Sequence, residues 1–315
     1  MNRDAQTNAG RQVGDPVFKW LTLVMALAVF VLIALIGCEL FRGSRLSLQK
    51  FGWHFLVSSE WDPVNDVYGA LPFIFGTLVS SAIALVIAVP VSIATAVYLT
   101  ELAPNRVRQP VIMFVELLAA VPSVILGLWG IFVMVPCLRD HFFPLLQKYL
   151  GFLPLFSGPH YGPCMLAAGI IVAIMIIPII TSLSREILRS VPGLQREAAY
   201  ALGATRWEVT RIAVLSYAKK GLFGAVILGL GRALGETMAV TMVIGNLPQI
   251  VPSLFAPADT LASTIANQFN EATGSLYPSA LFEIGLVLLG VTALVNVFAQ
   301  LLLKTFAGPG VKPQH

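Results

Sequence analysis

Two side chains of opposite charge stand four residues apart in an otherwise uncharged apolar stretch. Arg232 and Glu236 are the charged residues of the run Gly221–Leu247. On one helix, residues at i and i+4 share a face, so the two side chains can pair. A guanidinium offers a planar fork of donors that matches an oxyanion, and a carboxylate beside it can accept the hydrogen of a protonated oxyanion. The pair therefore indicates either an anion-binding site or a mutually neutralising pair that fixes helix packing.

Small polar and small apolar residues accompany this pair. Thr237 and Thr241 extend the face of Arg232 and could donate hydrogen bonds to the same anion, although hydroxyls in apolar helices usually bond back to their own helix. Glycines in the same run thin the helix and let a neighbour approach, whether for packing or to line a pore. These glycines are Gly224, Gly229, Gly231 and Gly235.

A second carboxylate lies in another apolar run, Val111–Val135. Glu116 and Pro122 in this run predict a kinked helix that faces a cavity, or else Glu116 is a packing or snorkelling residue near the end of a helix.

The sequence contains no pattern typical of a nucleotide-hydrolysing site or a metal site. No Gly-x-x-x-x-Gly-Lys-Ser/Thr phosphate loop occurs, so the chain itself is not an ATPase and we expect no enzymatic activity. The four histidines and three cysteines have no metal-ligand spacing, and we expect neither a metal nor a cofactor. The formal charge of +4 is typical of a membrane protein with basic inner loops, so we expect no nucleic-acid partner.

The elements that must position these residues are membrane helices. The chain has 315 residues, 57% of them hydrophobic and only 11% charged, whereas soluble domains are about a quarter charged. A helix needs about 20 mostly apolar residues to cross a bilayer. We predict an all-α, polytopic membrane protein with six transmembrane helices: Val17–Gly37, Ile74–Leu99, Val111–Val135, Gly162–Leu183, Gly221–Leu247 and Ile284–Leu303.

The distribution of Lys and Arg predicts the orientation in the bilayer. With the N-terminus inside, 14 of these residues fall on the cytoplasmic side and 5 on the outer side. We therefore expect both termini to be cytoplasmic. The predicted organisation is a cytoplasmic tail (1–16), a transmembrane domain (17–305) with outer loops at about 40–72, 137–161 and 248–280 and an inner loop at about 184–220, and a second cytoplasmic tail (306–315).

The inner loop at 184–220 carries signals for two short helices. Pro192 and Gly193 open the first, and Gly203 can end it in a left-handed conformation. Thr205 and Glu208 have the spacing of a capping box, so a second helix begins at Thr205. The loop is either a solvated hairpin or an element that docks a cytoplasmic partner, and its length and capped structure favour docking.

The docking interpretation rests on a motif. Glu197-Ala198-Ala199, followed after three residues by Gly203, resembles the EAA loop of importer-type ABC permeases. The resemblance implies that this helix sits in a groove of a separate ATPase subunit. The family pattern continues with Ile-x-Leu-Pro, where this chain keeps Leu215 but has Ala213 and Ser216 in place of the Ile and the Pro.

The run Gly229–Val240 resembles the signature of the PstC-type subunits of phosphate-specific ABC importers, which carry Arg-Ala-x-Gly-Glu-Thr-Met. Further similar stretches occur in the same order over about residues 50–300. The resemblance implies a type I ABC importer permease (MetI-like) fold in a bacterial inner membrane. It also implies a phosphate path past Arg232 and Glu236, and as partners a PstA-type permease subunit, a PstB-type ATPase dimer and a PstS-type binding protein.

Two alternatives to a phosphate importer remain open. One is a permease subunit for another oxyanion, such as sulfate or molybdate. The other is an ATP-independent channel or secondary carrier, for which the inner loop would have no role in transport.

Overall fold

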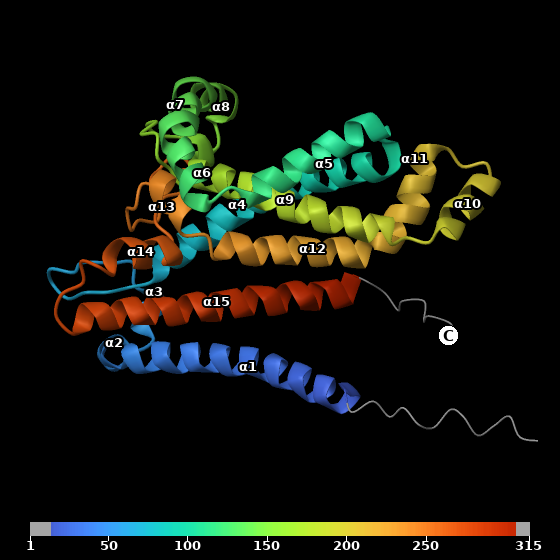
Figure 1. Ribbon diagram of the computed structural model, residues 1–315. Coiled ribbons are helices and arrows are strands. Elements are labelled where there is room, and N and C mark those ends of the chain that lie inside the picture. Colours follow the sequence, from blue (N-terminus) through green and yellow to red (C-terminus); the bar gives the residue numbers. More distant parts are fainter. Residues whose placement is uncertain (1–13, 307–315) are drawn as a thin grey trace, which may run out of the picture.

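The computed structural model describes residues 14–306, which fold as a bundle of long helices (Figure 1). No β-strand forms among these residues. Six helical segments are long and apolar enough to cross a membrane, as predicted. These segments are Val17–Gly43, Leu71–Leu102, Ser123–Leu150, Met165–Arg189, Arg206–Leu234 and Leu276–Lys304.

Short π-helical segments join several α-helices end to end, so that the helical segment continues through them. In chain order, the elements are α1 (Gly14–Gly43), α2 (Arg45–Phe51), α3 (His54–Val57), α4 (Leu71–Val97), η1 (Tyr98–Leu102), α5 (Asn105–Ala120), α6 (Ser123–Trp129), η2 (Gly130–Met134), α7 (Val135–Cys137), η3 (Leu138–Phe142), α8 (Phe143–Leu150), η4 (Pro154–Phe156), α9 (Met165–Arg189), α10 (Gly193–Ala201), α11 (Arg206–Glu208), η5 (Val209–Leu215), α12 (Ser216–Leu234), α13 (Met238–Ile244), α14 (Leu261–Gln268) and α15 (Leu276–Phe306).

Helix α9 is the centre of the bundle and packs along α4 and α12. Small buried residues of α4, such as Ser80 and Ala84, let α9 come close. Such residues are common between membrane helices, which associate by close packing because the hydrophobic effect does not act between them in lipid. A Cβ at Gly169 of α9 would collide with Ile83 of α4. The large apolar side chains of α9, among them Ile171 and Ile180, then fill the core.

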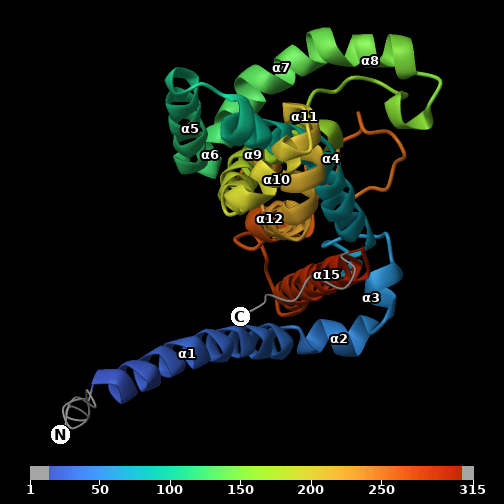
Figure 2. The same ribbon diagram turned by 90° about the vertical axis from the view of Figure 1, so that its right-hand side faces the viewer.

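The ends of the long helices separate into two groups along the bundle (Figure 1), and Figure 2 shows the bundle from the end that carries α10 and α11. The start of α1, the end of α15 and the hairpin of α10 and α11 lie at one end of the bundle. Helices α2, α3 and α14 lie at the opposite end. This arrangement keeps the predicted inner loop at the same end as both chain ends of the described residues.

The third predicted span, Val111–Val135, is wrong. Helix α5 ends at Ala120, and Val121 and Pro122 are extended, with φ/ψ of −68°/126° and −59°/139°. A residue before proline is pushed out of the helical region, and Pro122 cannot donate to the preceding turn, so the helix ends there rather than kinking. The membrane-length segment is Ser123–Leu150, so the first half of the predicted outer loop at 137–161 is helical.

The fifth predicted span, Gly221–Leu247, is also wrong at both ends. The helix that begins at Arg206 continues through η5 and α12, because its backbone bonds do not depend on the charged side chains that marked the predicted loop to residue 220. It ends at Leu234, and α13 begins only at Met238. The predicted outer loops at 40–72 and 248–280 likewise contain helices, namely α2, α3 and α14.

Candidate translocation path and coupling element

The charged pair lies at the break between α12 and α13, not on one continuous helix as predicted. Arg232 is in the last turn of α12, and Glu236 follows the final residue, Leu234. The two still approach each other, with Arg232 Nη2 3.5 Å from Glu236 Oε2. Glu236 Oε1 also accepts a hydrogen bond from the backbone N–H of Ala239 at 3.4 Å, so it caps the first turn of α13.

Each charge complements the helix end beside it. The C-terminal end of a helix carries a partial negative charge and the N-terminal end a partial positive one. Arg232 therefore stabilises the end of α12, and the carboxylate of Glu236 stabilises the start of α13. Broken membrane helices of this kind keep their free backbone groups for buried or cavity-lining positions.

Arg232 borders a cavity of about 230 Å³. Its side chain is 52% exposed, whereas that of Glu236 is 6% exposed. Both walls of the cavity are apolar; they come from α5, the extended residues after it, α6 and α9, and consist of Leu118, Ala119, Val121, Leu126, Met175 and Ile179. The guanidinium is thus the charged group of an otherwise apolar chamber, where it pairs with Glu236 and stays half exposed.

The other candidates near the pair are not brought to this cavity. Thr237 donates back to the carbonyl of Gly235 at 3.2 Å. The hydroxyl of Thr241 is buried and finds no hydrogen-bond partner among the described residues. Gly229 lets α12 meet α9, because a Cβ there would lie 2.6 Å from Ile180, whereas Gly231 faces open space.

The candidate coupling element is the hairpin of α10 and α11, and its caps form as the sequence predicts. Its second helix is not short, however, because α11 continues through η5 into α12. Helix α10 spans Gly193–Ala201, and Gly203 adopts the left-handed conformation with φ of 83°. Thr205 and Glu208 form the full capping box: the Thr205 hydroxyl accepts from the Glu208 N–H, and the Glu208 carboxylate accepts from the Thr205 N–H at 2.7 Å. These caps fix the sharp turn between α10 and α11.

One side of this hairpin is open. Glu197 and Ala198 of the EAA motif are exposed, and Ala199 is half-buried. Large apolar side chains surround them without cover, namely Leu194, Leu202 (89% exposed) and Trp207. Uncovered apolar side chains beside a short helix at the end of a bundle are typical of a protein interface.

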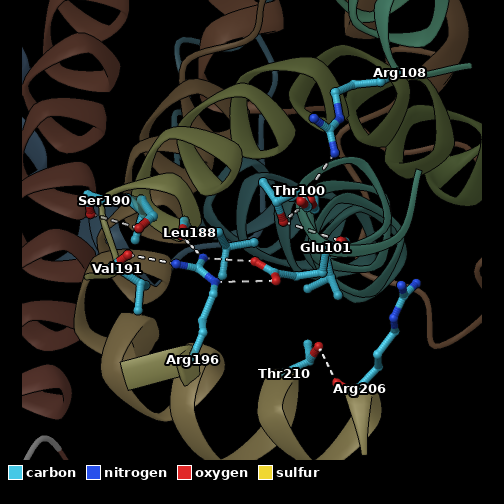
Figure 3. A network of polar contacts seen from close by, with 12 residues as sticks. Thr100, Glu101, Arg108, Leu188, Ser190, Val191, Arg196, Arg206 and Thr210 are labelled. Carbon is cyan, nitrogen blue, oxygen red and sulfur yellow. Dashed lines mark hydrogen bonds and ion pairs between the residues drawn. The ribbon is translucent and has the colours of Figure 1, made fainter. Parts of the chain in front are cut away.

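The sequence analysis did not single out the ion pair that holds α10 on the bundle (Figure 3). Arg196 of α10 donates through Nη2 to Glu101 Oε1 at 2.9 Å and through Nε to Oε2 at 3.4 Å. The same guanidinium donates to the carbonyls of Val191 at 2.7 Å and Leu188 at 2.9 Å, at the end of α9. Arg196 thus joins α10 to two membrane helices. Its partner is 95 residues away in the chain, and the one available signal was a Glu at the inner end of an apolar run.

Comparison with protein families identifies the family of this chain. Residues 88–307 match the model described as "binding-protein-dependent transport system inner membrane component". The chain belongs to this family, and within it to the PstC group. The curated relatives include "Phosphate transport system permease protein PstC" of Haemophilus influenzae, 48% identical over 92% of this chain and 93% of the relative. The protein of the same description from Mesorhizobium japonicum is 47% identical over 92% and 90%.

Solved structures of more distant permeases share the fold. A bacterial ABC transporter that imports the acidic polysaccharide alginate contains a chain that matches with a TM-score of 0.59 at 17% identity, over 93% of this chain and 98% of that one. The methionine transporter MetNI in inward-facing form matches with a TM-score of 0.52 at 19% identity, over 75% and 94%. The chain therefore has the MetI-like fold, and as a member of its family it is an all-α, multi-pass inner membrane component of a binding-protein-dependent transport system.

Proposed function

We propose that this chain is the PstC-type subunit through which an ATP-driven importer moves inorganic phosphate into the cell. The observation that carries the proposal is Arg232, a guanidinium at a helix break beside an otherwise apolar cavity. A charge within the bilayer costs about 2.5–3.5 kcal/mol, which favours a functional reason for its presence. The curated relatives from Haemophilus influenzae and Mesorhizobium japonicum are described as phosphate transport system permeases.

Each site residue has a role in this proposal. Arg232 meets the phosphate through its planar fork of donors, and Glu236 accepts the hydrogen of a protonated phosphate. Thr237, the residue before α13, and Thr241, within α13, supply further donors once α13 turns towards the path. Sulfate, which carries no proton at neutral pH, cannot supply the bond to Glu236.

The coupling element transmits the work of the ATPase. Glu197, Ala198, Ala199 and Gly203 form the surface that enters a groove of a PstB-type ATPase dimer, by the helix-in-groove mode. Closure of that dimer on ATP moves α10, and Arg196 passes the motion to α4 and α9. The membrane helices then alternate between outward-open and inward-open states, as in other transporters that rock around a central site.

The remaining partners and the orientation follow from this scheme. A PstA-type subunit completes the path across the exposed side of Arg232, and a PstS-type binding protein delivers phosphate at the end formed by α2, α3 and α14. Both termini and the α10 hairpin lie in the cytoplasm, on the inner face of a bacterial inner membrane, in line with the excess of Lys and Arg there.

The test is uptake of radiolabelled phosphate by vesicles that contain the four kinds of subunit. We expect uptake to require ATP and loaded binding protein and to persist in an excess of sulfate or molybdate. Competition by sulfate or molybdate would identify a different oxyanion as the substrate. Uptake without ATPase subunits would identify a channel or secondary carrier.

A further inference from the structure

A second arginine lines a separate, smaller cavity between α5 and α9, the two helices that also border the Arg232 cavity, and the function above does not use it. Arg185 is on α9, six residues beyond Ile179, which lines the Arg232 cavity. At 1.5 Å per residue this places Arg185 about 9 Å closer to the end that carries α10. Its side chain is only 13% exposed.

The guanidinium of Arg185 has unused donors. Its Nη2 lies 3.3 Å from Glu186 Oε1 and 3.7 Å from Glu116 Oε1. Among the described residues these are its two ion-pair partners, and both contact the same nitrogen. Its Nε is buried with no hydrogen-bond partner. A buried N–H of a charged group without a partner is costly, and a ligand oxygen would satisfy it.

A hydroxyl without a partner lies in the same small chamber. Thr181 is 1% exposed, and its Oγ1 has no hydrogen-bond partner among the described residues. Thr181, Arg185 and Glu116 line one cavity between α5 and α9, and its volume is about 10 Å³. That is room for about one water molecule, so the chamber is closed to a larger anion in this conformation.

Helix α5 is the cover of this chamber, and it is loosely held. None of its residues is buried, and it is bounded by Pro104 and Pro122, both with extended backbone. Glu116 comes from this helix. A small displacement of α5 would withdraw the Glu116 carboxylate and leave Arg185 and Thr181 facing an enlarged space between α5 and α9.

We propose that Arg185 and Thr181 form a second oxyanion station on the inner part of the path, with Glu116 as a counter-ion that the anion displaces. The proposal rests on the proposed function, because phosphate is the anion that the path carries. Phosphate released from Arg232 exchanges with Glu116 for the donors of Arg185 and leaves towards the α10 end when Glu116 returns.

The first test compares Arg185→Gln with Arg189→Gln in vesicles containing the full complex. Arg189 is a control from the next turn of α9, since it pairs with Glu186 alone at 3.9 Å and does not line the chamber. We expect phosphate uptake to fall about tenfold or more with Arg185→Gln, as loss of a charged donor changes equilibria by that order, and to stay within about twofold with Arg189→Gln. Equal rates in the two variants would overturn the station.

The Glu116→Gln variant distinguishes an anion station from a purely structural ion pair (a latch) that holds α5 on α9. A latch predicts similar losses for Glu116→Gln and Arg185→Gln, and recovery in the double variant, because the unpaired buried charge is gone. A station predicts that Glu116→Gln retains most uptake and that the double variant stays as low as Arg185→Gln. Recovery in the double variant would therefore contradict the proposal.

Thr181→Val supplies a test that does not depend on the folding of Arg185 variants. Because the hydroxyl has no partner at present, the valine variant should be at least as heat-stable as the wild type. We expect uptake to fall severalfold all the same, and unchanged uptake would contradict the station. Wild-type vesicles that take up no phosphate would instead overturn the proposed function itself.

Discussion

At the scale of the residue, the proposed path depends on charges placed at the ends of helices. Arg232 and Glu236 occupy the break between α12 and α13, where each complements the partial charge of its own helix end. The pair is therefore stable without a ligand, and yet half of the Arg232 side chain faces outward. A site of this kind can bind an anion briefly and release it, as transport requires.

Glu236 has two separable tasks, capping α13 and carrying charge. Glu236→Gln keeps an oxygen that can accept from the Ala239 N–H, whereas Glu236→Ala loses both the cap and the charge. We expect Glu236→Ala to destabilise the permease by about 1–2 kcal/mol and Glu236→Gln by less, although both lower phosphate uptake. Thermal unfolding of the purified complex measures the difference; equal destabilisation would contradict a capping role.

At the scale of the element, the two caps of the α10 hairpin carry the coupling surface. Gly203 has φ of 83°, a conformation that L side chains rarely adopt, whereas Gly193 begins a regular helix. Gly203→Ala should therefore destabilise the hairpin by about 1 kcal/mol and weaken co-purification of the ATPase, while Gly193→Ala should leave both unchanged. Binding of purified ATPase to each variant is the measurement, and loss with Gly193→Ala alone would contradict this account.

In the proposed coupling, the ion pair of Arg196 and Glu101 transmits motion between α10 and the membrane helices. The pair is partly buried and bidentate, so Arg196→Gln should weaken the attachment of α10 to the bundle by about 1.5–3 kcal/mol. We expect ATP hydrolysis to continue while the phosphate taken up per ATP falls severalfold. The exposed Arg106 at the same end of the molecule provides the control, Arg106→Gln, which should keep the wild-type ratio. An unchanged ratio in Arg196→Gln would show that another contact does the coupling.

Local patterns in the sequence predicted the caps of these elements, but they could not predict contacts between residues far apart in the chain. The capping box of Thr205 and the left-handed Gly203 depend on residues within one turn, so their spacing was sufficient. The break after Ala120 also has a local cause, the Val121–Pro122 pair. It was not predicted, because the sequence on both sides of the pair is apolar and has the pattern of one continuous span. The partnership of Arg196 with Glu101 spans 95 residues and could be seen only in the folded chain.

The same contrast applies to the candidate site. Arg232 and Glu236 were predicted from charge and spacing, and they do pair, although they do so across a helix end. Thr237 and Thr241 shared a face with Arg232 only on a continuous helix, and the break at Gly235 removes that geometry. Whether these hydroxyls reach the anion depends on a further movement of α13.

At the scale of the whole molecule, the permease is a bundle with two distinct ends and a broad exposed apolar surface. Helix α1 is exposed along its membrane-length segment, and most of α15 is little buried, as befits helices that face lipid or another subunit. The α10 hairpin marks one end and the α2, α3 and α14 group the other (Figure 1).

This polarity gives a labelling prediction. Val64 and Leu202 are each about 90% exposed. Val64 lies in the connection between α3 and α4, whereas Leu202 directly follows α10, which lies at the opposite end of the molecule from α3. In a variant whose three cysteines are replaced, Val64→Cys should react with an impermeant maleimide added to intact spheroplasts, and Leu202→Cys only after lysis. The reverse pattern would contradict cytoplasmic termini and a cytoplasmic coupling hairpin.

The central claim, that phosphate passes beside Arg232, is tested most directly by phosphate uptake in vesicles containing the Arg232→Gln permease with its partner subunits. Arg139→Gln is the control, because Arg139 is exposed and pairs with its neighbour Asp140 outside this cavity. The account predicts that Arg232→Gln assembles normally and loses uptake about tenfold or more, while Arg139→Gln transports as the wild type does. Full phosphate uptake by the assembled Arg232→Gln complex would contradict it.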